Sequence, residues 1–195
     1  MFEQPTIETE RLRLCPLDPS YTSAIQKAAS ARDIADTMIS LPHPYLAAEA
    51  ERYVTRQQAE RAAGRSATFI IEDKAGGFFH GLIELREIER EHSQGELSFW
   101  LDIAAWGHGY MTEVVAAVVQ YGFEDLALNR LYAYHMLRNP ASARVLEKNG
   151  FKQEGLLRQR VCKWESFEDV ALWAILRQEW QNTPVYHTWR HSDCV

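Results

Sequence analysis

The chain has 195 residues, of which 46% are hydrophobic and 25% are charged, and its formal net charge is −6. This composition is that of an ordinary globular protein, and the length is sufficient for one substantial hydrophobic core. A nucleic-acid-binding surface needs clustered basic residues, and none stands out, so no nucleic-acid partner is expected. The three cysteines, Cys15, Cys162 and Cys194, are too few and too widely spaced for a disulfide framework or a zinc site, and no metal is predicted.

The hydropathy pattern favours a cytoplasmic protein. The first residues do not combine a basic segment with an apolar one, as a secretory signal does. No apolar run approaches the roughly 18 residues that a membrane-spanning helix needs, so no membrane partner is expected. No stretch resembles a long linker, which favours a single domain.

The first half of the chain predicts one strand, a helical region and a three-stranded antiparallel meander. Leu12 and Leu14 alternate with arginines, as in a half-buried strand. Pro42 and Pro44 interrupt the helical region, because proline disfavours helical backbone at the residue before it. The expected elements are a strand ending near residue 16, helices from residue 18 and over 33–63, and strands at 67–72, 78–88 and 94–101.

The second half predicts a helix, a strand, a second helix and two strands. The expected bounds are 110–125, 131–136, 139–149, 152–161 and 169–176, and the residues from 178 onward show no clear period. A helix joins the strands 94–101 and 131–136, so these two strands are expected to be parallel. The predicted fold class is therefore α+β (mixed α/β), with a mostly antiparallel sheet of about seven strands.

Residues 106–113, Trp-Gly-His-Gly-Tyr-Met-Thr-Glu, lie where a strand turns into a helix. Gly107 and Gly109 permit positive φ and a close approach of the backbone. None of the residues just before the helix is a usual capping residue, so the first N–H groups are left for an anion, which the helix dipole also favours. A flexible strand-to-helix turn without a ligand is the alternative that fits the same residues.

Spacing excludes two common nucleotide-binding motifs at this loop. A P-loop needs Gly-Lys-Ser/Thr after a glycine and four further residues, and the chain has no such string. A dinucleotide fingerprint needs a third glycine three residues after Gly109, where the chain has Thr112. The ligand of this loop is then a phosphate carrier of another kind.

Two motifs about 30 residues apart resemble the GNAT superfamily of N-acetyltransferases. Residues 106–113 resemble its acetyl-CoA-binding loop, and a second match covers residues 139–142 and 144–151, followed by Glu154 and Gly155. Segments 8–12 and 169–180 are similar to the branch that contains the bacterial ribosomal-protein N-terminal acetyltransferases. The resemblance covers roughly residues 6–180, which we expect to form one acetyltransferase domain, with a C-terminal tail at 181–195.

The resemblance implies acetyl-CoA as cosubstrate, no metal, and a GNAT fold with helices on both faces of the sheet. It also implies that strands 94–101 and 130–136 splay apart around the pantetheine arm. The implied cofactor-binding residues are Leu101, Ile103, Trp106, Gly107, His108, Gly109, Tyr110, Met111, Asn139 and Ser142. The chain departs from the family at Ala104, where the loop commonly has Gln or Arg, and at Leu146, where many members have a tyrosine general acid.

Acetyl transfer to an amine needs a deprotonated amine and N–H donors for the oxyanion, and it is helped by a proton for the leaving thiolate. Strand alternation directs Glu96 to the face opposite Leu97, so Glu96 is the expected base and Glu84 on the neighbouring strand is the second choice. Ser142 is the expected hydrogen-bond donor on the thiol side. The alternatives are a solvated Glu96 and a Ser142 that bonds its own backbone.

The predicted function is transfer of acetyl from acetyl-CoA to a primary amine by direct attack in a ternary complex. A protein N-terminus is favoured through the branch resemblance, and its pKa of roughly 7.7–8.0, against about 10.4 for lysine, suits a carboxylate base. The candidates for the wall on the amine side of the site are Trp164, Phe167 and segment 42–45, with packing in the core as the alternative. His135 is expected to be packed in its strand. The alternative functions are acetylation of a polyamine, antibiotic or amino acid, and a non-catalytic acyl-CoA-binding module. For oligomeric state, the expectation is a possible homodimer.

Overall fold

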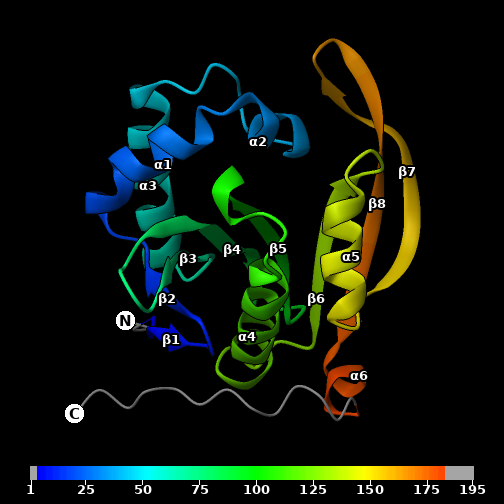
Figure 1. Ribbon diagram of the computed structural model, residues 1–195. Coiled ribbons are helices and arrows are strands. Elements are labelled where there is room, and N and C mark those ends of the chain that lie inside the picture. The colour runs from blue at the N-terminus through cyan, green and yellow to red at the C-terminus, as the bar shows by residue number, and fades with distance from the viewer. Residues whose placement is uncertain (1–3, 183–195) are drawn as a thin grey trace, which may run out of the picture.

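The computed structural model describes residues 4–182, which form one mixed sheet covered by helices on both faces (Figure 1). Among these residues the sheet has eight strands in the order β1-β2-β3-β4-β5-β6-β8-β7. The strands are β1 Ile7–Glu8, β2 Leu12–Pro16, β3 Ala67–Asp73, β4 Phe79–Glu89, β5 Gln94–Leu101, β6 Arg130–Met136, β7 Lys152–Lys163 and β8 Ser166–Leu176. The helices are η1 Pro19–Tyr21, α1 Thr22–Ala29, α2 Arg32–Thr37, α3 Ala47–Ala62, η2 Ile103–Ala105, α4 Tyr110–Glu124, α5 Pro140–Lys148 and α6 Arg177–Gln181.

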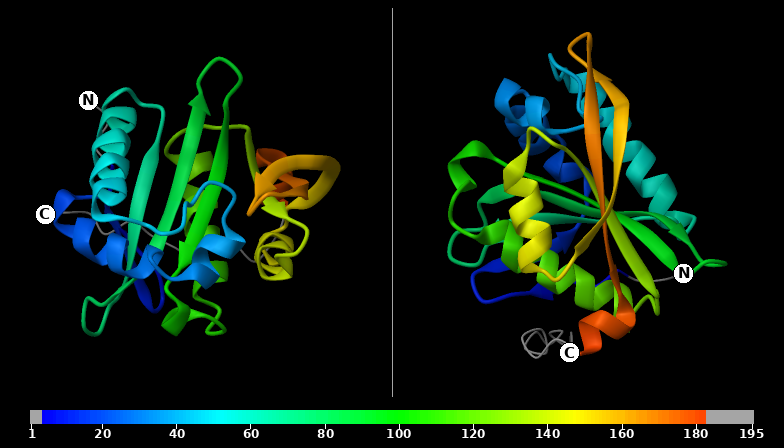
Figure 2. Two further views of the ribbon diagram at one scale, coloured as in Figure 1. Left: turned by 90° about the horizontal axis from the view of Figure 1, so that it is seen from above. Right: turned by 90° about the vertical axis from the view of Figure 1, so that its right-hand side faces the viewer.

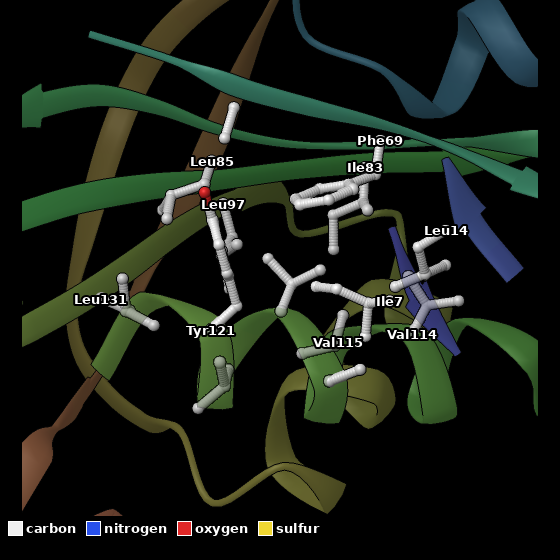
Figure 3. Close-up of a cluster of buried hydrophobic side chains, with 14 of the residues drawn as sticks. Ile7, Leu14, Phe69, Ile83, Leu85, Leu97, Val114, Val115, Tyr121 and Leu131 are labelled. Carbon is white, nitrogen blue, oxygen red and sulfur yellow. The ribbon is translucent and has the colours of Figure 1, made fainter. Parts of the chain in front are cut away.

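The two faces of the sheet carry separate hydrophobic clusters. Helix α4 packs on one face, where Val114 and Val115 meet Leu14, Ile83 and Leu97 (Figure 3). Helices α1 and α3 pack on the other face, and the two further views in Figure 2 show them on the side opposite α4. Each fully buried Val or Leu side chain stabilises the fold by roughly 1.5–3 kcal/mol, so these two clusters hold the layers together.

Helix α4 is apolar on more than one side because it is covered from several directions. Val114, Val115, Val118 and Phe123 are all fully buried, and α4 also contacts α5. In β4 and β5 successive side chains point to opposite faces of the sheet, and many are buried on both faces because helices cover each side. Leu97 packs towards α4, whereas Trp100 belongs to the cluster beneath α1 and α3. The predicted division of β5 into an apolar face and a face carrying Glu96 follows from this alternation.

The predicted order of strands and helices is confirmed, with three differences of detail. The sheet has an eighth strand, β1, whose two residues are too short to produce a sequence pattern. The helical region over 33–63 is broken over residues 38–46, a longer gap than the two prolines alone predict. A short helix, α6, begins the polar tail; beyond residue 182 the predicted tail lies outside the described residues.

Strands β5 and β6 are the parallel pair in this otherwise antiparallel sheet, and they splay apart as predicted. Their pairing runs from Gln94 opposite Arg130 to Leu97 opposite Ala133, where it stops. Residues 98–101 of β5 and 134–136 of β6 continue without pairing to each other. The backbone groups of β5 that face this gap therefore have no strand partner there, and a ligand between the strands can take that place. No helix within residues 4–182 is long and apolar enough to cross a membrane.

Candidate functional site

The connection from β5 to α4 is a loop of backbone donors, which we call the glycine loop (residues 106–109). The Asp102 carboxylate caps η2 by accepting from the Ala104 N–H at 2.9 Å. The chain then turns through Gly107 and Gly109, whose φ angles are 79° and 77°. Gly109 is the N-cap of α4 and offers no side-chain acceptor. Within the described part of the chain, none of the backbone N–H groups of residues 107–111 donates a hydrogen bond, so these donors are open to an anion.

A cavity of about 400 Å³, called here the donor cavity, lies against this loop between β5 and α5. Of the predicted cofactor-binding residues, those that line it are Leu101, Trp106, Gly107, Gly109, Tyr110, Met111, Asn139 and Ser142. Ile103 and His108 are absent from the lining. Ile103 is exposed on η2, and the His108 ring stacks on Tyr110 with 5.5 Å between ring centroids.

Two cations on α5 also line the donor cavity, and the sequence prediction missed them. Arg144 and Lys148 are four residues apart, a spacing that places both on one side of a helix. They provide positive charge beside the glycine loop, where Ala104 carries none. The i, i+4 spacing of two basic residues was the available signal, but the same spacing is also found on solvated helix faces.

The start of α5 is fixed by Asn139, which is the N-cap of this helix. The Asn139 side chain accepts from the Ser142 N–H at 3.2 Å, and its Nδ2 donates to the Ser142 Oγ at 3.0 Å and to the Thr37 carbonyl at 3.3 Å. Because the Ser142 hydroxyl oxygen accepts from Asn139, its own proton is directed elsewhere. Ser142 lines the donor cavity, so that proton is available to a ligand.

A second cavity of about 30 Å³, the acceptor cavity, lies where the pairing of β5 and β6 ends and the strands begin to splay. It shares Thr37, Met38, Phe99 and Ser142 with the donor cavity, so Ser142 stands where the two meet. The remaining lining consists of Ile39, Ser40, Arg86, Glu96, Leu97, Ser98, Tyr134 and His135.

Glu96 faces the acceptor cavity as a buried carboxylate. Its Oε1 accepts from Arg86 Nη2 at 2.6 Å, and only 7% of its side chain is exposed. Burial raises the pKa of Glu96, and the Arg86 charge opposes this rise without cancelling it. A carboxyl group with a raised pKa is a stronger base than an exposed one, which is what removal of an amine proton requires.

Glu84 is equally buried, but it lines neither cavity. Its Oε1 accepts from the Tyr53 hydroxyl and from Gln57 Nε2, both at 2.6 Å, and Arg86 Nη1 lies 3.8 Å from its Oε2. Burial raises the pKa of Glu84, while the hydrogen bond from Tyr53 lowers it. The two predicted carboxylates thus share Arg86, but only Glu96 reaches the space where a substrate fits.

His135 is held in one neutral tautomer. The Trp173 Nε1 donates to His135 Nε2 at 2.9 Å, and an indole nitrogen can only donate. Nε2 therefore carries no proton, and Nδ1 donates to the Met136 carbonyl at 2.9 Å. Both ring nitrogens are engaged, so His135 is a packed polar wall of the acceptor cavity.

One carboxylate ties α2 to the opposite side of the site; we call these contacts the Asp36 latch. Asp36 accepts from Arg138 Nη1 and from Trp164 Nε1, each at 2.6 Å. Lys163 Nζ donates to the Leu41 carbonyl at 2.6 Å. The latch holds Trp164 against Asp36, but Trp164, although predicted for the amine-side wall, lines neither cavity. The latch joins residues more than 100 positions apart, which no local pattern reveals.

The other residues predicted for the amine-side wall also lie outside both cavities. Tyr45 is buried in the cluster with α1 and α3, and no residue of segment 42–45 lines either cavity. Phe167 is exposed and lines neither cavity. Leu146, which replaces the usual tyrosine, is buried in the core beside α4, so it leaves no acid at that position. Within residues 4–182 no cluster of His, Cys, Asp and Glu is arranged to hold a metal ion.

Residues 11–152 match the family model of the acetyltransferase (GNAT) domain. The uncharacterized N-acetyltransferase YoaA of Bacillus subtilis is 28% identical over 173 residues, which cover 89% of this chain and 97% of that protein. YjcK of Bacillus subtilis, also named as an N-acetyltransferase, is 42% identical over 100 residues, or 51% of this chain and about half (55%) of its own length.

Two solved structures share this fold at low sequence identity. A ribosomal alpha-N-protein acetyltransferase in complex with coenzyme A has a TM-score of 0.82 and 19% identity, covering 88% of this chain and 97% of that one. The spermidine N-acetyltransferase of Vibrio cholerae in complex with CoA and spermine has a TM-score of 0.79 and 24% identity, covering 88% and 98%. Their folds agree with this one, whereas their named substrates differ.

Proposed function

This chain belongs to the acetyltransferase (GNAT) family, and we propose that it transfers acetyl from acetyl-CoA to the N-terminal α-amino group of a protein. The observation that carries the proposal is that the two cavities adjoin each other and share four lining residues. Free N–H donors lie at one end, the buried Glu96 carboxylate lies at the other, and Ser142 lies at the junction. A donor and an acceptor bound in these cavities meet directly, so no covalent enzyme intermediate is needed.

Acetyl-CoA fits the donor cavity by charge and by shape. Its pyrophosphate suits the open N–H groups of residues 107–111 at the positive end of α4, with Arg144 and Lys148 nearby. Its pantetheine arm suits the gap beyond Leu97, where amide groups of β5 lack a partner on the β6 side. Two structural neighbours were solved with CoA bound, which agrees with this assignment.

The charge of the acceptor cavity favours a singly charged amine. Its one carboxylate, Glu96, is already paired with Arg86, and His135 is neutral, so the described lining carries little net charge. A polyamine has several ammonium groups, and each needs a carboxylate when it leaves water. An α-amino group has one charge and the lower pKa, so it loses its proton more readily to a carboxylate.

In the proposed reaction Glu96 takes the proton of the bound ammonium, directly or through one water. The amine nitrogen then forms a bond to the acetyl carbon while the carbon–sulfur bond breaks, and the second proton that the nitrogen loses goes to the leaving thiolate, which departs as the CoA thiol. Ser142 donates its hydroxyl hydrogen bond towards the sulfur or the carbonyl oxygen at the junction of the cavities. Arg86 holds the Glu96 carboxylate in place and stabilises its charged form before the transfer.

The proposal is tested by thiol release from acetyl-CoA in the presence of matched acceptors. A short peptide with a free N-terminus, the same peptide with a blocked N-terminus but a free lysine, and spermidine form the panel. We expect release with the free N-terminus and background release with the other two. Release with spermidine alone would favour the polyamine function, and background release with every amine would favour a non-catalytic CoA-binding module.

A further inference from the structure

The turn between β1 and β2 packs against the glycine loop through one buried carboxylate. Glu113, in the first turn of α4, accepts from the Thr9 hydroxyl at 2.6 Å, from the Arg11 N–H at 2.8 Å and from Arg11 Nε at 2.7 Å. Burial acts to raise the pKa of Glu113, but the hydrogen bonds from Thr9 and Arg11 outweigh it and hold the pKa below its usual value. Glu113 is therefore a carboxylate in the folded protein.

Arg11 also contacts the glycine loop itself. Its Nη1 donates to the His108 carbonyl at 2.9 Å, and its guanidinium lies over the Tyr110 ring, 4.7 Å from the ring centroid. One side chain thus holds a loop carbonyl, an aromatic ring and the Glu113 carboxylate, all within the loop and the first turn of α4. The planar guanidinium can make these contacts together because its five N–H donors point in different directions.

The bond to His108 determines which way the next N–H group points. In a trans peptide the carbonyl and the following N–H lie on opposite sides. Because the His108 carbonyl is directed at Arg11, the Gly109 N–H is directed away from Arg11. Gly109 lines the donor cavity, and its N–H has no acceptor among the described residues. Glycine at φ 77° is conformationally free, so the orientation of this N–H group is easily lost. A hydrogen bond from another segment of the chain restricts it.

Glu113 creates an electrostatic cost that Arg11 removes. A carboxylate in the first turn of α4 lies near the open N–H groups and repels any anion that binds them. Two guanidinium nitrogens of Arg11 lie 2.7 Å from Glu113 Oε2, so the pair has no net charge. The helix start then presents its dipole and its N–H groups without a competing negative charge.

We propose that Arg11, anchored on Glu113, is a positioning residue for the phosphate-binding backbone of the glycine loop. It keeps the Gly109 N–H directed into the donor cavity and neutralises Glu113. The proposal rests on the proposed function, because it takes the pyrophosphate of acetyl-CoA as the ligand of the loop. It also gives a role to segment 8–12, which contacts neither cavity.

The test compares CoA binding by calorimetry in the full chain and in variants at two arginines of one sheet edge. Arg13 is the matched control: its side chain is 44% exposed, as is that of Arg11, and it pairs with Glu8 away from the loop. We expect Arg11→Ala to raise the Kd for CoA about tenfold or more, the effect of losing a charged hydrogen bond. Arg11→Lys is expected to raise it several-fold, because an ammonium cannot serve Glu113 and the His108 carbonyl together. Arg13→Ala and Arg13→Lys are expected to stay within about twofold of the wild type.

Kinetics separate positioning from general damage to the fold. For Arg11→Lys the KM for acetyl-CoA is expected to rise, while kcat at saturating acetyl-CoA and the KM for the amine stay within about twofold. Thermal melting identifies any variant that fails to fold, and the two lysine variants decide the outcome should Arg11→Ala do so. Equal Kd values for the Arg11 and Arg13 variants would overturn the proposal. Wild-type affinity for CoA in Arg11→Lys would show that positive charge alone is sufficient at position 11, and this result would also overturn the proposal. Absence of CoA binding by the wild-type chain would instead refute the proposed function and, with it, this proposal.

Discussion

Replacement of Glu96 by glutamine separates the proposed base from its structural surroundings. Glutamine keeps the size of the side chain and one oxygen that can accept from Arg86 Nη2, now 2.6 Å away. It cannot take a proton from an ammonium. Glu84 is the matched control, because it is as buried as Glu96 and also lies beside Arg86, but it lines neither cavity.

The size of the expected effect follows from the position of each carboxylate. A positioned general base contributes about 10²–10⁴-fold to the rate, so Glu96→Gln is expected to lower kcat/KM at least about 100-fold. Glu84→Gln removes a negative charge near the same arginine without removing a group that reaches the substrate. We expect it to lower kcat/KM by less than about fivefold, since its effect passes only through Arg86. Both variants are assayed by thiol release with a peptide acceptor, and melting curves verify that both are folded.

The pH profile supplies an independent test of the same assignment. The base acts as a carboxylate, so kcat/KM is expected to rise with pH through the pKa of Glu96, which burial raises above its usual value. In Glu96→Gln this acidic limb is expected to disappear. A kcat/KM within fivefold of wild type, a fall equal to that of Glu84→Gln, or an unchanged acidic limb would refute the reasoning.

Three further predictions concern the frame around the site. Gly81→Ala is expected to cost several kcal/mol of unfolding free energy, because a Cβ there would lie 2.3 Å from a backbone carbonyl oxygen of β5. In the control Gly77→Ala the new Cβ meets no atom within 4 Å, so the expected cost is only about 1–2 kcal/mol for the positive φ. Denaturant melts compare the two variants. Asp36→Ala breaks the Asp36 latch and is expected to raise the KM for the amine about threefold or more, with the KM for acetyl-CoA unchanged. The control Asp33→Ala, on the same helix, is expected to leave both KM values unchanged. An amine KM that is equal in the two variants would contradict this prediction. Ser142→Ala is expected to lower kcat about tenfold, the equivalent of about 1.4 kcal/mol for one hydrogen bond in the transition state, and an unchanged kcat in steady-state assays would exclude that role.

Local patterns were sufficient for the elements that form the donor side. Gly107 and Gly109 between an alternating strand and an apolar helix predict a loop with open N–H groups, which the structure contains. Asn139 followed by proline predicts a capped helix start, and that cap is what places Ser142 at the junction of the cavities. These features depend on residues that are close in the sequence, so a stretch of a few residues is enough to predict them.

Features that depend on pairing between distant segments could not be predicted. Alternation assigns Glu84 and Glu96 to the same face of the sheet, but only the register of β4 and β5 places Arg86 opposite Glu96. The register and the packing of α3 enclose Glu84, while the splay of β6 exposes Glu96 to a cavity. The Asp36 latch and the contact of Arg11 with Glu113 likewise join segments about 100 residues apart, and no local periodicity reports them.

The central claim is that the acceptor is a protein N-terminus and the donor is acetyl-CoA. Its most direct test is fragment mass spectrometry of one peptide that carries both a free α-amino group and an internal lysine, after incubation with the protein and acetyl-CoA. The account predicts one added acetyl group on the α-amino nitrogen, and none when Glu96→Gln replaces the wild type. An acetyl group on the lysine side chain, or an unmodified peptide under conditions in which spermidine is acetylated, would contradict it.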